Sequence, residues 1–154
     1  MSIVLMDTSI FCNVLDVPGF NQDRDSILTE LEDRIRSRDT LLLPMAAVLE
    51  TGNHIAHIAG GGGVRRMVAQ RFCDSVSEAI DGNLPWTPTP FWEVEQLRIW
   101  LSEFAAHAMR GVGMGDLSII KEWERQCELF PKRRVAIWSL DGDLQGFDQK
   151  AKFH

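Results

Sequence analysis

The feature of the sequence that most constrains the fold is the apolar run "IVLM" from Ile3 to Met6, which leads directly to Asp7 and two hydroxyl residues. Four apolar residues with β-branched members predict a short strand that is buried on both faces, as in parallel sheets. Open α/β sheets bind their ligands at the carboxyl ends of such strands. Asp7 is therefore either the N-cap of a helix that begins near Ile10 or the first residue of a functional site.

Short apolar strands alternate with amphipathic helices along the rest of the chain. "TLLLP" predicts a second strand stopped by Pro44, and "VAIW" predicts a last strand from Val135 to Trp138. We therefore expect an α/β sandwich with a mostly parallel central sheet, built as a single domain over residues 1–154 because a chain of this length buries one core. Helical periodicity is present in "DSILTELEDRIRSRD" with Ser26 as N-cap, "MAAVLETGNHIAHIA", "VRRMVAQRFCDSVSEAI", "EVEQLRIWLSEFAAHAMR" and "DLSIIKEWERQCELF".

Glycine and proline mark the irregular segments. "GGGG", from Gly60 to Gly63, predicts a loop or hinge, since glycine is unfavourable inside a helix. The three prolines of "NLPWTPTP" exclude a central strand and predict an irregular or edge segment. Trp86 and Trp92 belong to this region and are expected to be exposed, where they can stack on bases or form a protein interface. The stripe expected to face the core in the next helix is Val94, Leu97, Leu101, Phe104 and Ala105.

The charge balance narrows the function classes. Sixteen basic and twenty-two acidic side chains give a net charge of -6, which argues against extensive wrapping of duplex nucleic acid. Cys12, Cys73 and Cys127 are too scattered for a disulfide framework or a zinc cluster. We find neither a cationic leader with a cleavage site nor a run long enough to span a bilayer, so a cytoplasmic protein without membrane contact is expected.

Four acids follow strands or open helices. Asp7 follows the first strand, Glu50 lies in the second turn of the helix after the second strand, Asp116 opens a late helix, and Asp141 follows the last strand. Each has a structural alternative, because Asp7 and Asp116 can cap helices, Glu50 can be solvated, and "DGD" up to Asp143 can be a turn. Together they would meet at one sheet edge, where their mutual repulsion needs a divalent cation. Carboxylates suit Mg²⁺ or Mn²⁺.

"MDTS" after an apolar strand, the glutamate of the second strand's helix, the "GD" of a late helix and "SLDGDL" after the final strand together resemble a PIN domain of the kind found in VapC-type toxin ribonucleases. The resemblance spans nearly the whole chain. It implies a three-layer α/β/α fold, with Asp7, Glu50, Asp116 and Asp141 as the catalytic and metal-binding quartet. It further implies that Asp143 is an accessory metal ligand and that Ser9 and Ser139 help to hold the metal–water network.

The same resemblance implies a Mg²⁺- or Mn²⁺-dependent endoribonuclease that hydrolyses single-stranded or structured RNA, leaving a 5′-phosphate and a 3′-hydroxyl. A small antitoxin protein and a second copy of the chain are the expected partners. The apolar helices and "PWTPTPFW" also favour a homodimer. The alternative function is a non-catalytic PIN-like module that binds RNA or serves as a scaffold.

Histidines and basic clusters are left outside this predicted site. His54 and His57 lie three residues apart without nearby cysteines or an H-E-x-x-H pattern, so they are expected to be surface or packing residues. Arg65 and Arg66, and the cluster 132–134, are candidate phosphate contacts, although an ordinary solvated surface is the simpler interpretation.

Overall fold

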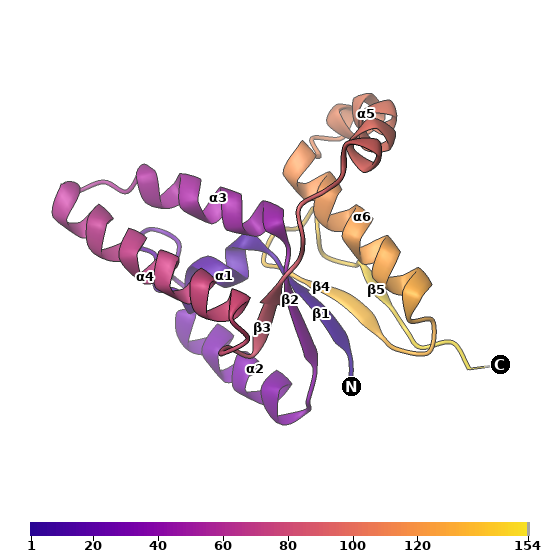
Figure 1. Ribbon diagram of the computed structural model, residues 1–154, viewed down its shortest axis with the longest axis horizontal. Coiled ribbons are helices and arrows are strands. Elements are labelled where there is room, and N and C mark those ends of the chain that lie inside the picture. The colour runs from indigo at the N-terminus through magenta and orange to yellow at the C-terminus, as the bar shows by residue number, and fades with distance from the viewer. Residues whose placement is uncertain (154) are drawn as a thin grey trace.

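The computed structural model describes residues 1–153, over which the chain forms an α/β fold with a five-stranded mixed sheet and six helices (Figure 1). The strand order is β3-β2-β1-β4-β5. The strands are β1 (Ile3–Met6), β2 (Thr40–Leu43), β3 (Trp86–Pro88), β4 (Val135–Trp138) and β5 (Asp148–Gln149). The helices are α1 (Thr8–Val14), α2 (Arg24–Arg36), α3 (Met45–Ala56), α4 (Gly62–Ile80), α5 (Val94–Met109) and α6 (Met114–Leu129).

The predicted mostly parallel sheet is confirmed. β1 pairs in parallel with β2 and β4, and β2 pairs in parallel with β3, whereas β5 is antiparallel to β4. In this register Leu5 lies opposite Leu42 on one side and Ile137 on the other. The carboxyl ends of β1, β2, β3 and β4 therefore meet at one edge of the sheet.

The apolar run of β1 is buried because helices supply apolar side chains to both of its faces. Val4 and Met6 belong to a hydrophobic cluster that includes side chains of α1, α2, α3 and α4. Ile3 and Leu5, which point the other way, belong to a second cluster with α6 and Leu144. Figure 1 shows α1 to α4 gathered at one side of the sheet and α6 at the other.

Two predicted helix starts are wrong by a few residues. Ser26 is not the N-cap of α2: Asp23 occupies that position, and the Ser26 hydroxyl donates a hydrogen bond to the carbonyl of Asp23 at 2.9 Å. The "GGGG" loop is shorter than expected, because Gly62 and Gly63 already belong to α4. Gly60 and Gly61 have φ angles of +103° and +109°, a region that favours glycine. They make the turn between α3 and α4.

The predicted inward stripe of α5 is also wrong. Val94 and Leu101 are 72% and 58% exposed, and Trp100 is the buried residue that anchors α5. The helix packs on α6 and stands away from the sheet in Figure 1. The period of the apolar residues is helical, as expected, but the described part of the chain does not cover that face.

The proline-rich segment forms the short edge strand β3, in agreement with the edge prediction. Trp86 is nevertheless buried, against expectation, because its ring packs edge-on against Phe11 with the ring centroids 6.3 Å apart. Trp92 is half-buried. Among residues 1–153, none of the helices has both the length and the apolar character that crossing a lipid bilayer requires.

Candidate metal centre

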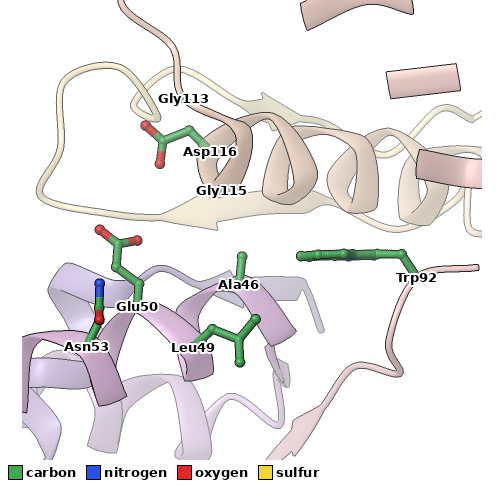
Figure 2. Close-up of a pocket in the computed structure, with 8 residues that line it drawn as sticks. All are labelled: Ala46, Leu49, Glu50, Asn53, Trp92, Gly113, Gly115 and Asp116. Carbon is green, nitrogen blue, oxygen red and sulfur yellow. The ribbon is translucent and has the colours of Figure 1, made fainter. Parts of the chain in front are cut away.

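The four acids singled out in the sequence line one cavity at the carboxyl edge of the sheet. Asp7 follows β1 directly, Asp141 follows β4, Glu50 lies in the second turn of α3, and Asp116 lies in the first turn of α6. All four border a cavity of about 140 Å³. Glu50 and Asp116 also border a larger neighbouring pocket of about 550 Å³, which lies between α3 and the start of α6 (Figure 2).

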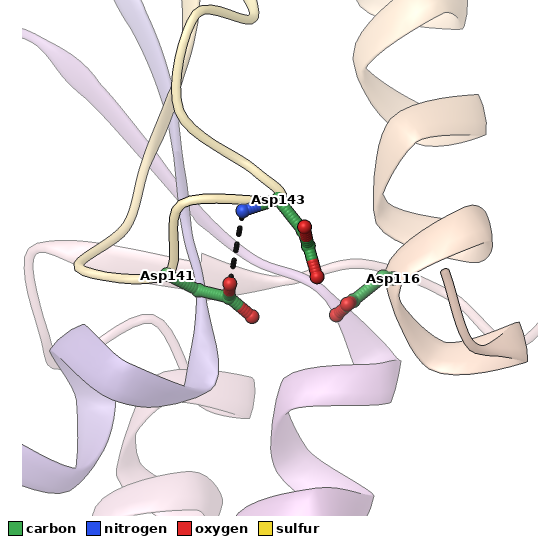
Figure 3. A group of neighbouring side chains, drawn as sticks. All are labelled: Asp116, Asp141 and Asp143. Carbon is green, nitrogen blue, oxygen red and sulfur yellow. Dashed lines mark hydrogen bonds between the residues drawn. The ribbon is translucent and has the colours of Figure 1, made fainter. Parts of the chain in front are cut away.

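A group of three carboxylates lies at the start of α6. One oxygen from each of Asp116, Asp141 and Asp143 falls within 4.8 Å of the other two (Figure 3). The backbone N–H of Asp143 donates a hydrogen bond of 3.0 Å to Oδ1 of Asp141. The "DGD" segment is therefore a turn, as its alternative interpretation proposed, and this turn brings both of its carboxylates to Asp116.

Asp7 occupies the N-cap position of α1, but its side chain makes no capping hydrogen bond. Its Oδ2 instead accepts hydrogen bonds from the hydroxyls of Ser139, at 2.7 Å, and Ser9, at 3.1 Å. The Ser139 oxygen in turn accepts the N–H of Asp141 at 2.9 Å. The serines thus tie β1 to the loop after β4 and hold a buried carboxylate in one orientation, with Oδ1 left for a ligand.

Glu50 is exposed, yet it is not free to move. The hydroxyl of Thr8 donates a hydrogen bond of 3.0 Å to Oε2 of Glu50. On the other side, Nε2 of His54 lies 3.7 Å from Oε1 of Glu50. The imidazole of His54 stacks on the ring of Phe20 with the centroids 4.2 Å apart. These contacts aim the Glu50 carboxylate at the cavity.

Thr8, Phe20 and His54 border the same cavity as the acids, and sequence reasoning missed all three. The spacing to His57, without nearby cysteines or an H-E-x-x-H pattern, predicts a surface or packing role for His54. The informative signal was its spacing to Glu50, four residues earlier on α3, which places both side chains on one helical face. Phe20 carried no such signal, because it comes from the loop between α1 and α2.

Burial, together with the charges of the neighbouring acids, with Asp7 and Asp141 foremost among them, raises the pKa of Asp116 to about 6. Asp116 is not the N-cap of α6, since that position belongs to Gly113. The carboxylate therefore loses solvation and faces other anions when it ionises. A site of this kind favours either a proton or a bound cation.

The residues present fit a hard divalent cation. Mg²⁺ and Mn²⁺ prefer oxygen ligands, and the three clustered aspartates supply carboxylate oxygens from two segments, the first turn of α6 and the loop after β4. For Mg²⁺, metal–oxygen distances of about 2.1 Å place neighbouring ligand oxygens about 3 to 4 Å apart. One oxygen from each of the three aspartates lies within 4.8 Å of the other two, which is close to this spacing.

The basic clusters take no part in the cavity. The Arg65 guanidinium donates a hydrogen bond to the carbonyl of Ile58. Arg133 donates to the carbonyl of Ser2, which places it at the opposite, amino-terminal edge of the sheet. Arg134 forms an ion pair with Asp148. Arg65, Arg133 and Arg134 therefore contact backbone carbonyls or a neighbouring acid away from the cavity, and a role in binding phosphate stays a prediction.

The candidate centre is thus described by its geometry: carboxylates from four segments, one of them held by two serines, around a single cavity. No family model, no curated protein sequence and no solved structure matches the chain.

Proposed function

We propose that the protein is a Mg²⁺- or Mn²⁺-dependent endoribonuclease with the three-layer α/β/α arrangement of a PIN domain. The observation that carries the proposal is the convergence of Asp7, Glu50, Asp116 and Asp141 on one cavity. Unpaired acids at one edge destabilise a fold by mutual repulsion, so their concentration there needs a function that uses it. Binding a cation for phosphodiester hydrolysis is such a function.

The surroundings of each acid suggest its role, either cation binding or orientation of the attacking water. Asp116, Asp141 and Asp143 would hold the cation, together with Asp7, which the serines orient. When bound, Mg²⁺ or Mn²⁺ would neutralise the carboxylates, polarise a phosphoryl oxygen and lower the pKa of a nearby water. Glu50, held by Thr8 and His54, accepts a hydrogen bond from the attacking water and orients it. Hydrolysis then leaves a 5′-phosphate and a 3′-hydroxyl.

The test is cleavage of a labelled single-stranded RNA by the purified protein with Mn²⁺ or Mg²⁺. We expect cleavage that stops in excess EDTA and returns when Mn²⁺ is added beyond the chelator. The matched variant Asp116→Asn should be inactive, whereas Asp25→Asn, an exposed first-turn acid of α2, should keep full activity. Cleavage that persists in EDTA would contradict the metal mechanism. RNA binding without cleavage under all these conditions would favour the non-catalytic module.

Action as a toxin in the cytoplasm, restrained by a small antitoxin protein, is the biological setting that we propose for this activity. Expression of the chain should arrest growth, and expression of the Asp116→Asn variant should not. The comparison separates nuclease toxicity from the general burden of overproduction, since the two proteins differ in one side chain.

A further inference from the structure

The pocket next to the acidic cavity has the dimensions and walls of a ligand site. Its volume of about 550 Å³ lies within the range that small-molecule pockets occupy. The indole of Trp92, which comes from the segment between β3 and α5, lines one end of the pocket and lies next to Ala46 in Figure 2. The remaining lining residues are Leu49, Glu50, Asn53, Gly113, Gly115 and Asp116.

The Trp92 ring is fixed before any ligand arrives. It packs edge-on against Trp100, with ring centroids 5.3 Å apart and an angle of 74° between the planes. It also packs on the hydrophobic cluster that contains Ala46 and Ile120. Because the ring is already ordered, a planar group that stacks on it incurs little loss of side-chain entropy.

The side chains that line the pocket favour binding of an uncharged part of a ligand. Lysine and arginine are absent from the pocket walls, and the two charged residues there, Glu50 and Asp116, are acids of the proposed metal centre. A phosphate alone would be repelled, whereas an unpaired base meets an indole and the apolar side chain of Leu49. The Asn53 carboxamide offers a donor and an acceptor for the edge of a base.

The opposite wall leaves room for such a group. Gly113 and Gly115 line the pocket at the start of α6, and a Cβ atom built on either would meet no atom within 4 Å. The pocket also shares Glu50 and Asp116 with the acidic cavity. A base held against Trp92 is therefore close to the phosphodiester bond that the acids would hydrolyse.

We propose that this pocket binds one unpaired base of the RNA next to the scissile phosphate, with Trp92 as the stacking surface. The inference rests on the proposed ribonuclease function and adds its substrate class: RNA whose base at this position is out of a duplex. A paired base is stacked between its neighbours and cannot enter a pocket walled by an indole.

The first measurement compares the steady-state cleavage of one single-stranded RNA by the parent protein, Trp92→Ala and Trp92→Phe. Loss of one base–indole stack should lower kcat/KM by about 5- to 100-fold, mainly through KM, and phenylalanine should restore most of it. Phe130→Ala is the matched control, because Phe130 is an exposed aromatic residue at the far end of α6. This variant should cleave like the parent.

The second measurement identifies what the ring contacts. Single abasic sites are placed in turn at each position around the cut. For the parent protein we expect one position where the missing base lowers kcat/KM by a factor similar to that of Trp92→Ala. For Trp92→Ala, the same abasic site should cause no further loss, since the interaction is already absent.

Because Trp92 is half-buried, Trp92→Ala can lose stability. The double variant Leu49→Ala with Asn53→Ala avoids this, since both residues are exposed, and it should reduce the abasic penalty at the same position. A thermal melt of each variant shows which ones are folded. If Trp92→Ala is not folded, the abasic penalty of the double variant decides whether the pocket binds a base.

The outcomes separate the two proposals. If the parent protein cleaves no RNA with Mn²⁺, the ribonuclease function and this inference both fail. If it cleaves but no abasic position is sensitive, or if the penalty is unchanged in the variants, the pocket binds no base and only this inference fails. Equal cleavage of a duplex and of the single strand would overturn it as well.

Discussion

Ser139, at the carboxyl end of β4, donates a hydrogen bond of 2.7 Å to Oδ2 of Asp7, at the carboxyl end of the neighbouring strand β1. The two residues are 132 positions apart in the sequence, and the parallel pairing of β1 with β4 brings them together. The contact orients a buried acid. The pairing of β1 with β4 therefore fixes the position of one carboxylate of the candidate site.

Replacement of Asp7 by asparagine tests whether this acid is part of a metal centre. Asp7→Asn keeps an oxygen that accepts the serine hydroxyls and removes one negative charge from the cavity. We expect loss of cleavage, a melting temperature without metal that equals or exceeds that of the parent, and a smaller stabilisation by Mn²⁺. With Mn²⁺ at a hundredfold excess over Kd, binding adds about 2.7 kcal/mol, or roughly 5 to 10 °C, to the parent protein.

The control for Asp7→Asn is Asp25→Asn, which removes an exposed acid from the first turn of α2. That change should lower stability by about 0.3 to 1 kcal/mol and leave the Mn²⁺ shift intact. If Asp7→Asn behaves like this control, Asp7 acts at the start of α1 alone and the metal-centre proposal loses one ligand.

The raised pKa of Asp116 predicts a pH-dependent stability of the metal-free protein. Its pKa of about 6 in the folded state exceeds the ordinary value of 3.8, so the folded state binds more protons between these limits. Stability from this group is therefore lost as the pH rises from about 4 to about 6. Relative to the parent in EDTA, Asp116→Asn should gain melting temperature across this interval and keep a constant advantage at higher pH. A difference that does not change with pH would contradict the raised pKa.

Removal of the Ser139 hydroxyl tests the positioning of Asp7. Ser139→Ala loses the bond to Asp7 and the bond from the N–H of Asp141. We expect a decrease of about 10- to 100-fold in Mn²⁺ affinity or activity, because groups that orient metal ligands have effects of this size. The concentration of Mn²⁺ that gives half-maximal cleavage is the measurement. Ser102→Ala, on the exposed surface of α5, removes a comparable hydroxyl and should change nothing.

The exposed face of α5 leads to a prediction about assembly. Val94, Leu97 and Leu101 lie on one side of the helix and are 72%, 36% and 58% exposed. A contiguous apolar face of this kind favours association, and we expect a homodimer at micromolar concentration. Leu101→Glu should shift the sedimentation coefficient to that of a monomer, whereas Ala106→Glu, at an exposed position of α5 away from this face, should not. A parent protein that sediments as a monomer would contradict this prediction.

Sequence reasoning located β1, β2, β4 and the acids because these depend on local rules, whereas it did not predict β5. A continuous apolar run such as β1 identifies a strand covered on both faces, and parallel pairing then places Asp7 and Asp141 at one edge. Sequence reasoning failed to predict burial where burial depends on which other element covers a surface. The stripe of α5 is amphipathic but open to solvent, and Trp86 is buried because α1 supplies Phe11. No period in the sequence contains that information.

The two outer strands of the sheet leave little backbone for another chain to pair with. β3 is three residues long and ends at Pro88, with prolines at 85 and 90 on either side of it, and β5 has only two residues. Proline lacks the N–H that a new strand would need, and so short an edge offers few carbonyls. Growth of the sheet from one molecule into the next is thereby blocked. Association through the strands is therefore disfavoured, and contacts with a second copy are expected to use exposed side chains, such as the apolar residues of α5.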